Sequence, residues 1–231
     1  MTRLEAPFGR WDPAPLSEVV EMFAGVRGAS ADCGSSGACG SSGPGPGWWV
    51  AGGLAIELAV GHPIRSHGDI DVLLLRRDQL VAQRALAGWQ WWAADPPGSL
   101  RPWAPGEVLP LGVHDIWCRP GPDAPWRVQV MLDESQGDSH GQEPEWVSRR
   151  DPRVRRPIST LGAVSEEGVP FLAPDVQLYY KAKAPRPKDE ADFDAVLPVL
   201  TERQRGWLVG AITRTYGPHP WIRRLRGSSP G

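Results

Sequence analysis

The chain has 231 residues, a formal net charge of -2 at pH 7 and a mean hydropathy of -0.33. This length suits one large domain or two small ones and can bury a core, while the near-neutral charge argues against a protein that binds DNA or RNA regardless of sequence. The sequence has no run of eighteen apolar residues and no charged-then-apolar leader. We therefore expect no membrane span, no secretory signal and a cytoplasmic location. The three cysteines fit a reducing compartment, and Cys33 and Cys39 are expected to be free thiols.

The first predicted element is an amphipathic helix, because apolar residues recur at helical spacing at Leu16, Val19, Val20 and Phe23. Residues 28–47 then consist almost entirely of Gly, Ser, Ala and Pro. Such a segment buries too little apolar surface to offset its chain entropy. We predict a flexible insertion there, with a flap over a bound nucleotide as the alternative.

The segment from Trp48 to Gly53 is predicted to be a short apolar strand that ends in a glycine turn, and Leu54 to Val60 begins a helix. Gly52 and Gly53 would let the backbone approach an anion closely. The free N–H groups and the positive dipole end of the following helix favour negative charge there. This layout predicts a phosphate-binding site.

Two acids follow this turn and flank a single isoleucine, since Asp69 and Asp71 enclose Ile70 at the head of the apolar run Val72 to Leu75. Residues two apart in a strand project from the same face, so both carboxylates should point the same way. Carboxylates that close repel each other unless a cation lies between them. Mg²⁺ suits the gap, because it takes one or two carboxylates and completes its shell with water and substrate phosphates. The alternative is a solvated acidic pair at a strand edge.

Two further residues precede the acids. Arg65 is the predicted phosphate partner, because a guanidinium binds phosphate in a two-pronged geometry. His67 either orients a carboxylate or fills a turn.

Together these residues resemble a known signature. The segment from Trp49 to Asp78 resembles the polymerase-beta-like nucleotidyltransferases, and it is most similar to the aminoglycoside 2''-adenylyltransferase group, whose members move AMP from ATP to an antibiotic hydroxyl. The resemblance is carried by Gly52-Gly53-Leu54-Ala55-Ile56-Glu57 and by Arg65-Ser66-His67-Gly68-Asp69-Ile70-Asp71-Val72. It implies an α/β fold with a small, mixed, twisted sheet of about five strands flanked by helices. It also implies two Mg²⁺ ions and ATP or another NTP as substrate.

The resemblance further implies a third carboxylate on a neighbouring strand. In the strand expected around Val128, Gln129 stands where that acid should be, and an amide cannot act as a general base. Asp133 shares the face of Gln129 but lies about 13 Å further along a regular strand. We rank Asp133 first as the third acid, Asp115 second and Glu134 third.

Between the acid pair and this strand we predict a helix from Arg77 to Leu86, a strand from Trp89 to Trp92 and a loop from Asp95 to Gly106. Tryptophan is frequent, with twelve residues in the chain. Four tryptophans could stack on a base or a sugar, although core packing is the simpler expectation: Trp91, Trp103, Trp117 and Trp146.

The second half is predicted to be mainly helical. Leu172 to Asp175 forms a turn into a helix with proline at an early position, and a new helix follows the break at residues 185–187. The resemblance places these helices on the nucleotide side of the cleft, where Lys181 would stabilise a transferring phosphate. Lys188 either contributes there or pairs with Asp192 on a solvated helix face.

We therefore expect residues 1–150 to form the catalytic domain, with residues 28–47 as its insertion, and residues 151–231 to complete the cleft. The expected reaction is Mg²⁺-dependent transfer of a nucleoside monophosphate, AMP from ATP, to a hydroxyl of a small, aminoglycoside-like acceptor, with release of pyrophosphate. The alternative is a catalytically degenerate nucleotide-binding protein or a toxin–antitoxin partner with the same fold. The expected site residues are the catalytic acids Asp69, Asp71 and Asp133, the first two also binding metal, and the nucleotide-binding residues Gly52, Gly53, Arg65, His67 and Lys181.

Overall fold

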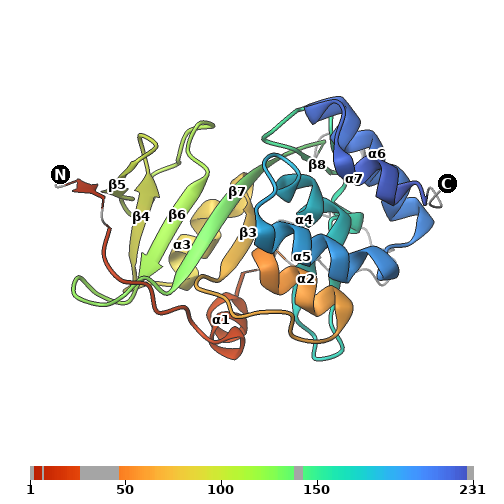
Figure 1. Cartoon of the computed structure of the whole chain (residues 1–231). Coiled ribbons are helices and arrows are strands. Elements are labelled where there is room, and N and C mark those ends of the chain that lie inside the picture. The colour runs from red at the N-terminus through yellow and green to blue at the C-terminus, as the bar shows by residue number, and fades with distance from the viewer. Residues whose placement is uncertain (1–2, 7, 27–46, 138–142, 228–231) are drawn as a thin grey trace, which may run out of the picture.

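The computed structural model describes residues 3–6, 8–26, 47–137 and 143–227. The insertion predicted at residues 28–47 lies outside the described residues except for Gly47. The described residues form a mixed α/β structure with seven α-helices and a large, mostly antiparallel sheet, which confirms the predicted fold class (Figure 1). None of the helices in these ranges is long and apolar enough to cross a bilayer.

Strands occur throughout the described sequence up to residue 172. They are β1 (Leu4–Glu5), β2 (Trp48–Val50), β3 (Asp71–Leu75), β4 (Gln90–Ala94), β5 (Ser99–Pro102), β6 (Asp115–Arg119), β7 (Val128–Gln136), β8 (Glu145–Val147), β9 (Arg155–Pro157), β10 (Gly162–Val164) and β11 (Pro170–Leu172).

Helices alternate with these strands in the first half and follow one another in the second. They are α1 (Leu16–Phe23), α2 (Gly52–Val60), α3 (Gln79–Ala85), α4 (Pro174–Lys181), α5 (Pro187–Val196), α6 (Glu202–Tyr216) and α7 (Pro220–Leu225), with short 3-10 turns at Arg76–Asp78, Ile158–Thr160 and Leu197–Val199.

The sheet runs in the order β1-β5-β4-β6-β7-β3-β2-β11-β10, with β8 paired to β7 and β9 to β8. The pairs β3–β7 and β2–β11 are parallel, and the other pairs are antiparallel. The sheet thus has eleven strands instead of the about five expected. Several strands have only two to four residues, too few for an alternating pattern to show in the sequence. One of them, β5, lies inside the segment 95–106 that was wrongly predicted to be loop.

The two faces of the sheet carry chemically different side chains, as the pairing register of the strands shows. Trp92, Trp117, Gln129 and Asp71 lie side by side in one row across β4, β6, β7 and β3. Because successive strand residues alternate between faces, Trp91 projects from the opposite face. There the apolar residues of β3, β6 and β7 form the core with helices α1 and α3, and Figure 1 shows α3 behind β6 and β7.

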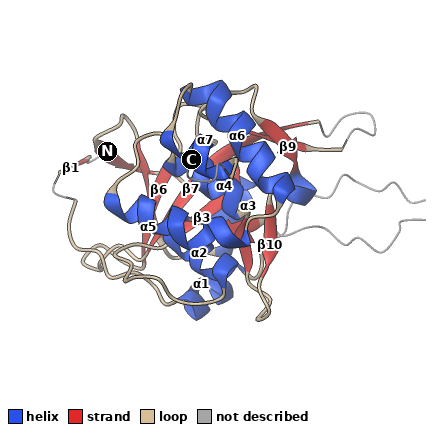
Figure 2. Ribbon diagram, turned by 45° about the vertical axis from the view of Figure 1, so that its right-hand side comes forward, coloured by secondary structure: helices blue, strands red, loops and turns tan. Residues whose placement is uncertain are grey.

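The second-half helices cluster at the end of the sheet near β3. Helix α2 packs against α4 and α5, and α4 packs against α6, so the helix that follows the glycines is held by residues from the far end of the chain (Figure 2). The predicted helix start at residue 174 is confirmed. The region after residue 150 also adds β9, β10 and β11, and β11 pairs with β2.

Candidate active site

The glycines before α2 lie directly beside Asp71. The N–H of Ala51 donates to the backbone oxygen of Asp71 at 2.8 Å. Gly52 has φ +68°, and a Cβ atom on it would overlap the Asp71 carboxylate. Position 52 therefore requires glycine both for its backbone conformation and for this close approach.

The first N–H of α2 already has a partner. Gly52 donates its backbone N–H to Oε1 of Gln177 on α4 at 2.9 Å. The predicted phosphate site is therefore closed on one side by a side-chain amide. An anion at this helix start has to share this donor with Gln177 or replace the amide oxygen. No local pattern predicts this contact, because an isolated glutamine on a helix indicates no particular partner.

Asp71 and Asp69 influence each other electrostatically. Asp71 is the first residue of β3, and Asp69 lies in the extended segment just before it. Burial, and then the charge of Asp69, raise the pKa of Asp71 to about 7, against the opposing charges of Lys181 and Lys188. Two carboxylates that disfavour each other's charge are a donor set that fits Mg²⁺. The described part of the chain contains no cluster of three or more His, Cys, Asp or Glu side chains arranged to hold a metal.

Glu57 organises the loop that leads to these acids. Its Oε1 accepts hydrogen bonds from the backbone N–H groups of Ile64 and Arg65, at 2.8 and 3.0 Å, and lies 2.8 Å from Nε2 of His67. Burial raises the pKa of Glu57, but these hydrogen bonds outweigh burial and hold it below its usual value. His67 thus orients a carboxylate, although that carboxylate belongs to Glu57. We had no sequence signal for this role, because Glu57 has the spacing of an ordinary helix glutamate.

The guanidinium of Arg65, the predicted phosphate partner, is paired with a carboxylate in this structure, and its binding of phosphate stays a prediction. Its Nε and Nη2 donate to the two carboxylate oxygens of Asp192 on α5, at 3.1 and 3.2 Å. A Cβ atom on Gly53 would overlap the Arg65 and His67 side chains. Gly53 therefore makes room for this ion pair and for the loop that carries it.

Lys181, the last residue of α4, lies where a phosphate-binding lysine was expected. Its Nζ is 3.0 Å from Asp189 and 2.8 Å from Asp192, and its side chain is only 7% exposed. Asp192 therefore pairs with Lys181 and Arg65, which excludes the alternative pairing with Lys188. Lys188 forms no ion pair within the described residues, and its charge is close enough to lower the pKa of Asp71.

These groups surround a cavity of about 160 Å³ on the Asp71 face of the sheet. Its walls include Gly52, Asp71, Gln177, Tyr180, Lys181 and Arg186. Ligand pockets for whole molecules usually measure roughly 300–1,000 Å³, so this cavity matches the size of a phosphate group better than that of a nucleotide.

Asp133, the first-ranked third acid, does not line this cavity, and its catalytic role stays a prediction. Strand β7 stays regular to Gln136, so no bend brings Asp133 back toward Asp71. The residue is fully buried. Its Oδ1 accepts from Arg149 at 3.0 Å, and its Oδ2 accepts from Trp146 at 2.7 Å and from the Tyr180 hydroxyl at 2.6 Å. Asp133 thereby holds two cavity-wall residues, Arg149 and Tyr180, in place.

Asp115 is the third-acid alternative that faces Asp71. Gln129 lies directly opposite Asp71 in the parallel register and donates from Nε2 to Asp115 Oδ1 at 3.3 Å. The charge of Asp115 also contributes to the raised pKa of Asp71. Glu134 is engaged elsewhere, since its Oε1 accepts from Arg76 Nε at 2.7 Å.

Comparison with known proteins confirms the resemblance. Residues 43–89 match the family model of aminoglycoside-2''-adenylyltransferase. No curated protein matches the chain.

Two solved structures are similar to this chain at low identity and low TM-score. The lincosamide antibiotic adenylyltransferase LnuA, bound to lincomycin, is 11% identical over 66% of this chain and 87% of its own, with a TM-score of 0.41. ANT(2")-Ia in complex with adenylyl-2"-tobramycin is 16% identical over 72% of this chain and 87% of its own, with a TM-score of 0.40. A likeness at this level does not extend to function.

Proposed function

We propose that this protein is a nucleotidyltransferase that moves a nucleoside monophosphate, AMP from ATP, to a hydroxyl of a small aminoglycoside-like acceptor. The observation that carries the proposal is the close approach of Gly52 to the Asp71 carboxylate. Asp69 lies near enough for its charge to raise the pKa of Asp71, and the family match at residues 43–89 includes all three residues. In the reaction, the acceptor oxygen forms a bond to the α phosphorus, the bond from that phosphorus to the bridging oxygen breaks, and pyrophosphate leaves.

Positive side chains on the α4–α5 side would receive the triphosphate. Lys181 lines the cavity beside Asp71, and Arg186 lines it with a side chain that is 62% exposed. Lys188 supplies a further charge near Asp71 that no carboxylate neutralises within the described residues. Cations fixed where charge develops on a transferring phosphate stabilise the transition state. Arg65 acts indirectly in this proposal, by fixing the loop before Asp69 through Asp192.

Asp69 and Asp71 would hold Mg²⁺. When bound there, Mg²⁺ would neutralise the paired carboxylates and the phosphate oxygens. Asp115 would accept the proton of the acceptor hydroxyl, because among the three alternatives it is the acid whose charge acts on Asp71. Gln129 would orient Asp115 through their hydrogen bond.

The test is direct. The protein is incubated with ATP, Mg²⁺ and a panel of hydroxyl-bearing acceptors that includes aminoglycosides, and pyrophosphate release and a gain of one AMP in acceptor mass are measured. We expect Asp69→Asn and Asp71→Asn to lose at least about 10–100-fold in turnover with unchanged circular dichroism. Asp194→Asn, an exposed acid on α5, is the control and should keep its activity. Near-normal turnover in either of the first two variants would refute the mechanism.

A second candidate function is nucleotide binding without transfer. Two observations favour it, the amide of Gln129 opposite Asp71 and the Gln177 oxygen on the N–H of Gly52. In that case ATP binds, as measured by calorimetry, but no acceptor in the panel leads to pyrophosphate release.

A further inference from the structure

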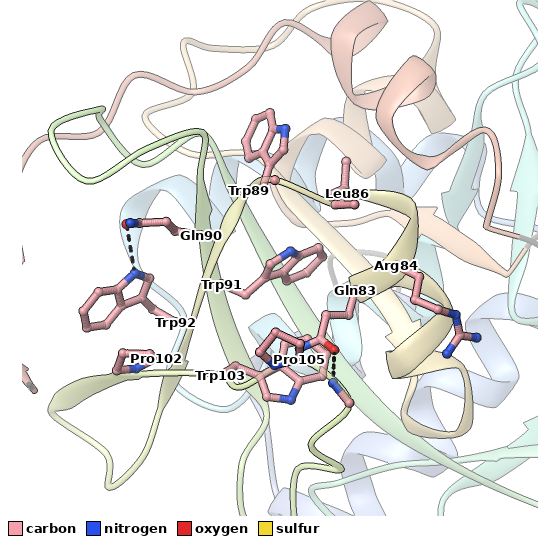
Figure 3. Close-up of a pocket in the computed structure, with 13 residues that line it drawn as sticks. Gln83, Arg84, Leu86, Trp89, Gln90, Trp91, Trp92, Pro102, Trp103 and Pro105 are labelled. Carbon is pink, nitrogen blue, oxygen red and sulfur yellow. Dashed lines mark hydrogen bonds between the residues drawn. The ribbon is translucent and has the colours of Figure 1, made fainter. Parts of the chain in front are cut away.

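The cavity beside Asp71 has three cations in its walls, Arg149, Lys181 and Arg186, and one carboxylate, Asp71. A larger cavity of about 550 Å³ lies at the end of α3 (Figure 3), and its one charged wall residue is Arg84. Cationic side chains that surround a small space attract anions and donate strong hydrogen bonds to phosphate. Of these two cavities, the smaller one therefore has the walls that suit a phosphate group.

Arg149 is fixed in this wall and still has a donor to spare. Its Nη1 donates to Asp133 at 3.0 Å, its guanidinium carbon lies 4.8 Å from the centre of the Tyr180 ring, and its Nη2 is 3.7 Å from the sulfur of Met131. Its Nε–H has no partner within the described residues, yet this nitrogen is not sealed inside the protein. Arg149 thus has an accessible donor, and it lines the cavity.

The floor of the cavity extends toward the proposed base. Met131, whose sulfur contacts Arg149, lies in register with Leu73 on β3 and with Asp115 on β6. Leu73 and Met131 both line the cavity. Because Leu73 is two residues after Asp71, this row lies on the Asp71 face of the sheet. A phosphate group held by Arg149 would therefore share a face with Asp71 and with Asp115.

Gln177 supplies a second donor from helix α4. The residue is 6% exposed and lines the same cavity. Its Oε1 accepts the N–H of Gly52 at 2.9 Å. Its Nε2 makes no hydrogen bond within the described residues and is not sealed inside the protein. Gln177 thus occupies the helix N–H that a phosphate would use and offers its own amide N–H groups instead.

Gln83, in the wall of the larger cavity, makes the same kind of contact but uses both ends of its amide. It accepts from the N–H of Gly106 at 2.8 Å, as Figure 3 shows, and donates to the carbonyl of Ala104 at 3.0 Å. Both glutamines therefore hold a glycine N–H. Gln177 differs in that the donor end of its amide is unused within the described residues.

We propose that a phosphate group of the nucleotide binds in the cavity beside Asp71, between the guanidinium of Arg149 and the amide N–H of Gln177. This inference rests on the proposed function, since the nucleotide supplies the phosphate. A hydrogen bond from a guanidinium to a phosphate is charge-assisted and therefore strong. The amide of Gln177 adds a donor whose direction is fixed by its contact with Gly52.

Inorganic pyrophosphate with Mg²⁺ is the probe, because it carries the phosphate chemistry without a nucleobase or an acceptor. Calorimetry on the full-length protein measures its affinity. Arg149→Gln should weaken binding at least about tenfold, the effect of one hydrogen bond to a charged group. Gln177→Glu keeps an acceptor for Gly52 but replaces the donor by a carboxylate, which is ionised at about pH 8. We expect a loss at least as large in this variant.

Two control variants match these changes. Arg76→Gln also removes a buried arginine from an ion pair, since Arg76 Nε lies 2.7 Å from Glu134, but Arg76 does not line this cavity. Gln83→Glu also adds a negative charge to a glutamine that accepts from a glycine N–H. Both controls should bind pyrophosphate as wild type does. Losses in the controls as large as those in Arg149→Gln and Gln177→Glu would overturn the proposal.

The proposal also fails if wild type does not bind pyrophosphate, or if folded Arg149→Gln or folded Gln177→Glu binds it as tightly as wild type. Thermal unfolding of each variant establishes that it is folded. Arg149→Gln leaves the buried Asp133 without its cation. Should that variant not fold, the double variant Asp133→Asn with Arg149→Gln removes both charges and takes its place. Gln177→Glu decides the question independently.

Transfer assays distinguish a failure of this contact from a failure of the proposed function. If wild type transfers AMP and both variants keep the wild-type kcat/KM for ATP, the function stands and the contact is refuted. If wild type binds pyrophosphate through Arg149 and Gln177 but transfers nothing to any acceptor, the contact stands and the proposed function fails.

Discussion

Arg65 and Asp192 form a two-pronged ion pair across 127 positions of the chain, with Nε–Oδ1 and Nη2–Oδ2 distances of 3.1 and 3.2 Å. Asp192 is only 1% exposed and also lies 2.8 Å from Nζ of Lys181. One buried carboxylate therefore joins the loop before Asp69 to the end of α4. The relative position of the acid pair and the lysine depends on this contact.

Replacing Asp192 by Asn should destabilise the protein strongly. Removing one partner of a buried ion pair leaves an uncompensated charge and costs about 3–5 kcal/mol. Here Arg65 loses its carboxylate partner, while Lys181 loses one of two and keeps Asp189. Urea unfolding measures the change in free energy of unfolding.

Asp194→Asn is the matched control for this prediction. Asp194 lies two residues further along the same helix and pairs with Arg224, but both side chains are largely exposed. Exposed pairs contribute only about 0–1 kcal/mol. Equal losses in the two variants would show that the buried pair has no special role.

Gly52→Ala should impair both folding and transfer. An alanine at this positive φ costs roughly 1–2 kcal/mol by backbone strain alone, and its Cβ would also overlap the Asp71 carboxylate. Because Asp71 would have to move, we expect turnover to fall at least about tenfold, as it does when the support of a metal ligand is disturbed. Pyrophosphate release and urea unfolding are the measurements.

Gly61→Ala separates the two effects. Gly61 has φ +80°, but a Cβ atom there would meet nothing within 4 Å. This variant should lose a similar amount of stability from strain and keep its activity. If Gly52→Ala behaves like Gly61→Ala, the contact with Asp71 is unimportant.

Local patterns in the sequence were sufficient to predict some of the elements around the site, although strand β11, which pairs with β2, was not predicted. Helix α1 begins and ends at the expected residues, and Val128, Val130 and Leu132 of β7 are fully buried as their alternation predicted. These features depend on neighbours within a few residues, which a periodic pattern records.

The partners of the charged residues could not be predicted in this way. The sequence shows that Arg65 is a cation near the acids, but not that its carboxylate comes from α5. In the same way, the alternation in β7 places Asp133 on the Gln129 face, yet its burial depends on Trp146, Arg149 and Tyr180 from later elements. Both predictions assigned a catalytic or binding role to a group whose tertiary contacts a local sequence pattern does not record.

Acid stability should depend on Asp151. The hydrogen bond from the Arg153 guanidinium is the main cause that lowers the pKa of Asp151 to about 2, from a usual value of about 3.9. A carboxylate with a lowered pKa in the folded state stabilises the protein above the unfolded-state pKa, and this contribution disappears as pH falls through the folded-state pKa. Asp151→Asn should therefore lower the unfolding temperature at pH 7, and the difference from wild type should vanish between about pH 4 and pH 2.

Unfolding temperatures across this pH range give the measurement. Arg153→Gln should reproduce the effect, since it removes the main donor to Asp151. Asp123→Asn, in an exposed turn, should leave the pH profile unchanged. A difference that grows as the pH falls from about 4 would contradict the assigned direction.

Asp115 and Asp133 should have different roles. Asp115 lies on the Asp71 side and accepts a hydrogen bond from Gln129, so Asp115→Asn should lower kcat by about 10²–10⁴, the usual contribution of a general base. The KM for ATP should change little, because the residue would act on the acceptor. Asp133→Asn should instead reduce stability, since Arg149 would lose its buried partner. Steady-state kinetics and urea unfolding on both variants separate the two roles. Glu134→Gln is the control and should keep kcat. A normal kcat in Asp115→Asn, combined with a loss in folded Asp133→Asn, would return the catalytic role to Asp133.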